Sequence, residues 1–115
     1  MTLQHKPMIE VRFTLPFIRR LKPLAKRYRK IQSDIQPIIE QLQNGNLIGD
    51  QISGLDFTIF KVRAKNSDIP IGKSGGYRVI YQVVSPELVL LLLIYAKSDQ
   101  ADVSLEEIED AISKA

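Results

Sequence analysis

With 115 residues, of which 44% are hydrophobic and 25% charged, the chain has the size and composition of one globular domain, residues 1–115, that needs no disulfide or metal. It contains no cysteine, which excludes thiol catalysis, disulfide bonds and cysteine-ligated zinc. Residues 1–98 carry 15 Lys and Arg against 7 Asp and Glu, so this basic body either suits a polyanion such as nucleic acid or is a solvated surface rich in lysine.

The N-terminal region predicts a strand followed by a helix. Apolar and polar side chains alternate over residues 8–14, as in a half-buried strand. The helix is expected to begin near Pro16, because apolar residues then recur at helical spacing: Phe17, Leu21, Leu24 and Tyr28. Pro23 lies within this pattern and is expected to kink the helix or to move its start. Among the cations that lie between the apolar positions, Arg27 and Lys30 are candidates for contact with nucleic-acid phosphates, unless the whole set is a solvated outer face.

A second helix is expected after Ser33, a residue type that often caps helices, with Pro37 in its first turn. Its apolar stripe consists of Ile35, Ile38, Ile39 and Leu42. Asn followed by Gly at residues 44–45 predicts the end of the helix. The two helices would form a helical hairpin, and residues 45–56, which are rich in glycine, are interpreted as a connector.

The next two strands are expected to carry positive charge. Three cations alternate with apolar residues and therefore share one face of a strand: Lys61, Arg63 and Lys65. A strand from Tyr77 to Val84 would pair with this one as a hairpin across residues 66–76. That pairing would bring Arg78 close to the row of cations.

The last part of the chain predicts a buried strand and an acidic helix. Residues 88–95 are apolar on both faces, as in the interior of a sheet, and are too few to cross a membrane, which needs roughly 20. The N-terminus has no long apolar segment either, so we expect a cytoplasmic protein without membrane contact. Ser104 and Glu107 form a capping box that marks a C-terminal helix, whose acids would lie near the basic sheet face or be solvated.

The expected fold class is therefore α+β. It consists of an N-terminal strand and a helical hairpin packed on a mostly antiparallel four-stranded sheet, with a C-terminal helix.

Several catalytic schemes are excluded by the residues that the chain lacks. Its one histidine, His5, lies in the N-terminal segment, so no histidine-based triad or dyad is expected. The acids are scattered or lie on the last helix, so we expect no metal site and no cofactor. The sequence GKS at residues 72–74 resembles the end of a nucleotide-binding loop, but Ser67 stands where the first glycine of that loop should be.

A group of positive side chains, here named the cationic cluster, remains as the candidate site: Lys61, Arg63, Lys65, Lys73, Arg78 and Lys97. Such a group can perform phosphodiester chemistry without a metal, because arginines stabilise the charge that grows on the phosphorane oxygens. A lysine crowded by other cations tends to lose its proton and could act as base toward a ribose 2′-OH. The alternative is a phosphate-binding surface without chemistry. Tyr77 and Tyr81 share the apolar parity of their strand, so core packing is expected for them rather than base stacking.

Three segments carry a family likeness: FKVRAK at 60–65, GKSGGYRVIY at 72–81 and LLLIYAKSDQADVS at 91–104. Together they resemble the RelE/ParE superfamily of type II toxin-antitoxin toxins, and most closely its HigB-like branch. The resemblance covers residues 8–112 and implies a RelE-like toxin. It implies a ribosome-dependent mRNA endonuclease, an mRNA interferase that acts by 2′-OH attack, gives a cyclic phosphate and inhibits translation. The implied partners are a cognate antitoxin, the ribosome with its mRNA, and promoter DNA bound through the antitoxin complex.

The candidate catalytic residues are therefore Lys61, Arg63, Arg78, Lys97 and Tyr95, and the candidate substrate-binding residues are Lys65, Lys73, Arg27 and Lys30. Ser98 and Ser104 stand where RelE toxins carry an arginine and a catalytic tyrosine, so the role of that tyrosine falls to Tyr95 or to another group. Two alternatives remain open. One is a ParE-like inhibitor of DNA gyrase without nuclease activity, and the other is a degenerate relative that binds RNA without cleaving it.

Overall fold

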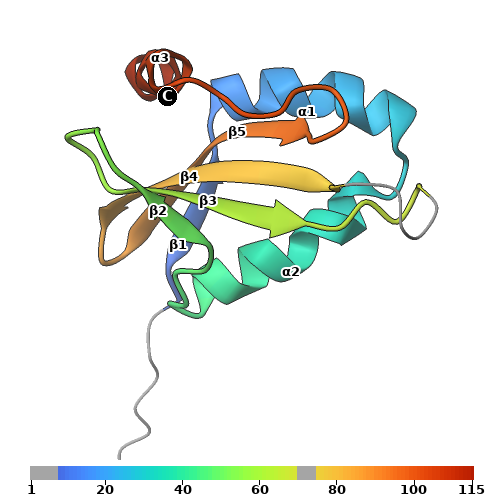
Figure 1. Ribbon diagram of the computed structural model, residues 1–115. Coiled ribbons are helices and arrows are strands. Elements are labelled where there is room, and N and C mark those ends of the chain that lie inside the picture. The colour runs from blue at the N-terminus through green and yellow to red at the C-terminus, as the bar shows by residue number, and fades with distance from the viewer. Residues whose placement is uncertain (1–7, 70–74) are drawn as a thin grey trace, which may run out of the picture.

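The computed structural model describes residues 8–69 and 75–115, and these form one five-stranded sheet with three helices (Figure 1). The elements are β1 (Glu10–Phe13), α1 (Leu15–Arg27), α2 (Ile31–Gln43), β2 (Asp50–Ile52), β3 (Ile59–Ala64), β4 (Tyr77–Ser85), β5 (Leu88–Ala96) and α3 (Leu105–Lys114). The strand order is β1-β5-β4-β3-β2, and only β1 runs parallel to its neighbour. The expected α+β class and the mostly antiparallel sheet are confirmed. Lys73 and His5 lie outside the described residues.

The expectation of four strands was wrong, because part of the predicted connector forms β2. This strand pairs with β3 at the edge of the sheet, with Asp50 opposite Lys61. It is preceded by Gly49, whose φ of 96° lies in the left-handed region. A Cβ at this glycine would clash with the carbonyl oxygen of Lys61, so glycine is required where the backbone approaches β3.

Helices α1 and α2 cover one face of the sheet. Their apolar stripes pack with residues of β3, β4 and β5 in one core cluster that includes Phe17, Leu21, Leu24, Ile31, Ile35, Ile38, Leu42, Val62, Val79, Tyr77, Tyr81 and Ile94. Thr14 caps α1 by accepting a hydrogen bond from the backbone of Phe17, and α1 continues through Pro23. Tyr77 and Tyr81 are fully buried here, as predicted.

The predicted start of α2 was wrong. The helix begins at Ile31 and has Lys30 as its N-cap, without a hydrogen bond from a capping side chain. Ser33 does not cap the helix, because its hydroxyl donates to the carbonyl of Lys30 instead. Pro37 consequently lies inside the helix rather than in its first turn. The end was predicted correctly, with Asn44 as the C-cap.

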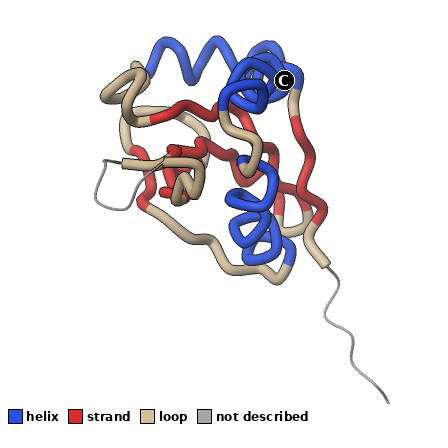
Figure 2. Tube along the Cα trace, turned by 90° about the vertical axis from the view of Figure 1, so that its right-hand side faces the viewer, coloured by secondary structure: helices blue, strands red, loops and turns tan. Residues whose placement is uncertain are grey.

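Helix α3 packs on the opposite face of the sheet. Its buried residues join a second core cluster with residues of β3, β4 and β5, among them Ile59, Ile80, Leu93, Tyr95, Ile108 and Ala111. The capping box of Ser104 and Glu107 is confirmed. In Figure 2 the strands lie in the middle of the molecule, with α1 and α3 toward the top of the view and α2 lower down. None of the helices in the described ranges has the length and apolar character needed to cross a membrane.

Candidate active site

The strand register places three of the candidate catalytic residues side by side. Arg63 of β3 lies directly opposite Arg78 of β4, which in turn lies opposite Tyr95 of β5. All three belong to the α3 face of the sheet, because their neighbours in sequence point into the core beneath α1 and α2. The prediction that a β3–β4 hairpin brings Arg78 close to the cations of β3 is confirmed.

The guanidinium of Arg78 is held in a buried position without a carboxylate partner. The residue is 8% exposed, and Nη1 donates to the backbone carbonyl oxygens of Gly75 and Tyr77. Within the described ranges no carboxylate lies within 4.0 Å of it. A buried cation opposite a second arginine has its remaining donor capacity available for an anion. This pair can therefore hold a phosphate between them.

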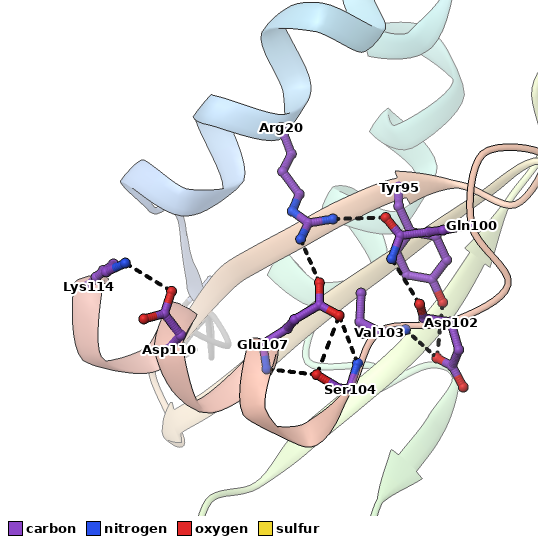
Figure 3. A network of polar contacts seen from close by, with 9 residues as sticks. All are labelled: Arg20, Tyr95, Gln100, Asp102, Val103, Ser104, Glu107, Asp110 and Lys114. Atoms are coloured by element: carbon purple, nitrogen blue, oxygen red, sulfur yellow. Dashed lines mark hydrogen bonds and ion pairs between the residues drawn. The ribbon is translucent and has the colours of Figure 1, made fainter.

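Lys61 and Tyr95 share a carboxylate, that of Asp102 (Figure 3 shows the Tyr95 contact). The Lys61 Nζ lies 3.3 Å from Oδ1 and 3.5 Å from Oδ2, and the Tyr95 hydroxyl donates to Oδ1 over 3.2 Å. The backbone N–H of Val103 also donates to Oδ1, over 2.8 Å. This last hydrogen bond is the main reason why the pKa of Asp102 is lowered, with Lys61 and Tyr95 acting in the same direction.

The hydroxyl of Tyr95 is a donor at neutral pH. Burial, followed by the negative charge of Asp102, raises the pKa of Tyr95 to about 12. The ammonium group of Lys61 faces the carboxylate of Asp102 rather than other cations alone.

Asp102 lies in the segment that joins β5 to α3, residues 97–104, here named the crossover segment. Arg27 of α1 forms an ion pair with Asp99 over 2.7 Å, and Arg20 of α1 donates to Gln100 over 3.1 Å. Lys97 donates from Nζ to the carbonyl oxygen of Ala101 over 2.7 Å. The segment is thus tied to α1 on one side and, through Asp102, to the sheet on the other.

In the part of the chain that the structure describes, the acids of α3 form no ion pair with the cations of the sheet, although such a contact was one of the two expectations for this helix. Glu107 pairs with Arg20 over 2.9 Å, and Asp110 pairs with Lys114 of the same helix (Figure 3). The charge compensation comes instead from Asp102, which the sequence did not single out. Asp102 is 41 residues from Lys61, and no local pattern signals a contact of that range.

The remaining candidate residues are more dispersed. Lys65 is exposed just beyond the end of β3, and Lys97 follows β5, where its side chain covers Gly75. Arg27 and Lys30 are exposed at the junction of α1 and α2. In residues 8–69 and 75–115 no three His, Cys, Asp or Glu side chains are grouped as metal ligands.

The architecture has a counterpart among solved structures. The chain is similar to a structure described as a mutant of E. coli toxin RelE in the free state, with a TM-score of 0.57 over 92% of this chain and 96% of that chain. The chain has the RelE toxin fold. The sequence identity is 17%, so the similarity lies in the backbone arrangement. No protein-family model matches the sequence, and comparison with curated proteins gives no significant match.

Two serines of this chain stand at positions where the resemblance to RelE toxins predicts other residues. Ser104 is occupied as the N-cap of α3, where its hydroxyl accepts from the backbone N–H of Glu107 over 3.1 Å. Ser98 is exposed in the crossover segment. The polar groups gathered near Arg63 and Arg78 in this RelE-like fold are instead Lys61, Tyr95 and Asp102.

Proposed function

We propose that the protein is the toxin of a type II toxin-antitoxin system and acts as a HigB-like mRNA interferase. It cleaves mRNA on the ribosome as a metal-independent endoribonuclease and so inhibits translation in the cytoplasm. A cognate antitoxin protein binds and neutralises it, and the complex binds promoter DNA. The similarity to toxin RelE supports this proposal at the level of the fold.

The observation that carries the proposal is the direct opposition of Arg63 and Arg78 on neighbouring strands. Two guanidinium groups without a carboxylate between them form a site for a phosphodiester and for the additional charge of its phosphorane. In the reaction, the ribose 2′ oxygen forms a bond to phosphorus and the bond to the 5′ oxygen breaks. The products are a 2′,3′-cyclic phosphate and a 5′ hydroxyl.

Purified protein incubated with translating ribosomes should produce new 5′ ends in the message, mapped by primer extension. The Arg78→Ala variant should lower the cleavage rate by about 100-fold or more, because one donor to the transition state is lost. Arg63→Ala should give a similar loss with the fold intact, since Arg63 is exposed. Arg12→Ala serves as the matched control, because Arg12 lies on the edge strand β1, which is separated from β4 and β3 by β5.

Intact message after incubation of the wild-type protein with active ribosomes would refute the nuclease. Induction that raises double-strand DNA breaks with intact message would indicate a ParE-like gyrase inhibitor. RNA binding that weakens with salt, without cleavage or growth arrest, would indicate a degenerate relative.

A further inference from the structure

The Asp102 carboxylate is the only one in the described part of the chain that forms an ion pair with the cationic cluster. It receives hydrogen bonds from three different places: Lys61 of β3, Tyr95 of β5 and the backbone of Val103. These contacts tie the crossover segment to the sheet, and they also place a carboxylate on the sheet face that carries Lys61 and Arg63. The position of Asp102 therefore calls for a chemical explanation.

Exposure separates the roles of Asp102 and Tyr95. The side chain of Asp102 is 60% exposed, whereas Tyr95 is 3% exposed and lies in the core beneath the crossover segment. Lys61 is intermediate, with 31% of its side chain exposed. A ligand that approaches this face therefore meets Asp102 and Lys61, and the phenol of Tyr95 acts on the ligand only through the carboxylate that it orients (Figure 3).

We propose that Asp102 is the general base of the cleavage reaction, that Lys61 is its general acid, and that Tyr95 is a positioning residue. This inference rests on the proposed nuclease function and names the residues that move its protons. A carboxylate and an ammonium group in hydrogen-bond contact, on the face that holds the arginine pair, provide both a proton acceptor and a proton donor.

The protons balance over one turnover. Asp102 takes the proton of the ribose 2′-OH as the 2′ oxygen forms its bond to phosphorus. The bond between phosphorus and the 5′ oxygen breaks, and the leaving oxygen takes a proton from the Lys61 ammonium. The protonated Asp102 then returns its proton to the neutral Lys61 across their contact of 3.3 Å. Both groups are restored without a metal or a second substrate.

The hydrogen bonds to Asp102 fix the direction of its carboxylate, because two of the donors come from rigid strands. They also lower the pKa of its carboxyl group, which keeps it ionised at neutral pH but makes it a weaker base. Tyr95 cannot itself be the base at neutral pH, since the pKa of its phenol is raised to about 12.

Asp102→Asn tests the proposal, with single-turnover cleavage and RNA affinity measured on the same preparations. Cleavage should fall by about 100-fold or more, the usual contribution of a general base. RNA affinity should be unchanged or increased, because a negative charge is removed from an anion-binding face. Asp102→Glu should restore part of the rate. Asp110→Asn removes an acid from the exposed side of α3 and should leave the rate within about twofold.

The dependence of the rate on pH separates a carboxylate base from a lysine base. With Asp102 as base, the wild-type rate should be level between about pH 6 and 8, whereas a lysine base would give about a tenfold rise per pH unit. Tyr95→Phe should move the acidic limb of the profile to higher pH, because one of the hydrogen bonds that lower the pKa of Asp102 is lost. A merely structural role for Tyr95 would leave that limb in place.

An Asp102→Asn protein that cleaves as fast as wild type, or faster, would overturn the inference and leave the nuclease proposal standing. A wild-type protein that does not cleave would refute the nuclease proposal itself. If Asp102→Asn does not fold, the Asp102→Glu rate and the Tyr95→Phe pH profile decide, and an unshifted acidic limb would refute the assignment.

Discussion

Replacing Arg63 by glutamate should stabilise the fold while it destroys the proposed site. Arg63 lies directly opposite Arg78, and no acid in the described ranges pairs with either guanidinium. Like charges at opposite positions of antiparallel strands destabilise a sheet, and opposite charges there stabilise it. Because Arg78 is 8% exposed, its charge is poorly compensated by water and should respond to a new carboxylate partner.

The expected gain follows from the sum of these two effects. Removing the repulsion and adding an attraction should each contribute a few tenths of a kcal/mol to about 1 kcal/mol, so the free energy of unfolding should rise by about 1 kcal/mol. For a domain of this size that corresponds to an increase in Tm of about 4 °C. Cleavage should be lost at the same time, because an anion now lies where a phosphate would bind.

Urea denaturation followed by circular dichroism gives the free energy of unfolding for wild type, Arg63→Glu and the control Lys65→Glu. Lys65 is an exposed neighbour outside the paired strand, and its change should have an effect below about 0.5 kcal/mol. The gain of Arg63→Glu should shrink in about 1 M salt, where the Debye length is about 3 Å. An unchanged or lower stability of Arg63→Glu at low salt would show that the two side chains do not repel each other.

Tyr81→Phe should cost about 1 kcal/mol of stability, because the Tyr81 hydroxyl donates to a backbone carbonyl over 2.7 Å. Tyr77→Phe should be neutral or stabilising, because the buried Tyr77 hydroxyl has no partner among the described residues. Equal losses of Tm in the two variants would contradict this. Gly76→Ala should lower stability by about 2 kcal/mol or more in a urea titration, because Gly76 has φ of 55° and a Cβ would clash with the Ala64 carbonyl oxygen. In the Glu107→Gln variant, Tm should fall less than in the wild type as the pH is lowered. The pKa of Glu107 in the folded state is lowered, first by the backbone hydrogen bond at its capping box. The ionised carboxylate therefore stabilises the fold above pH 4.5, and this stabilisation disappears as the pH falls through the pKa of the folded state. Parallel Tm curves of the two proteins from about pH 3 to 7 would refute this.

The features that the sequence predicted correctly are those that depend on residues close together in the chain. The alternation of Lys61 and Arg63 with apolar residues required one charged and one buried face of β3, and the structure has both. The capping box of Ser104 and Glu107 was predictable for the same reason, because it is a contact within one helical turn. Such contacts depend on the order of a few residues and on little else.

The features that sequence missed depend on contacts between distant segments. Residues 50–52 have no apolar alternation and form β2 only because the edge of β3 offers hydrogen-bond partners. The path of the crossover segment depends on contacts with α1, namely the ion pair of Arg27 with Asp99 and the hydrogen bond of Arg20 to Gln100. Asp102 reaches Lys61 by the same path, so its place in the site could not be inferred from its neighbours in the chain.

The position of β5 in the sheet has a consequence for the biosynthesis of the protein. It is the last strand in sequence, yet it lies in the interior between β1 and β4 (Figure 1). A chain that is still being synthesised therefore cannot complete its core until residues 88–96 have left the ribosomal tunnel, and it cannot place Asp102 until later still. Under the proposed function, the ribosome that makes this protein does not meet an active molecule during most of its synthesis.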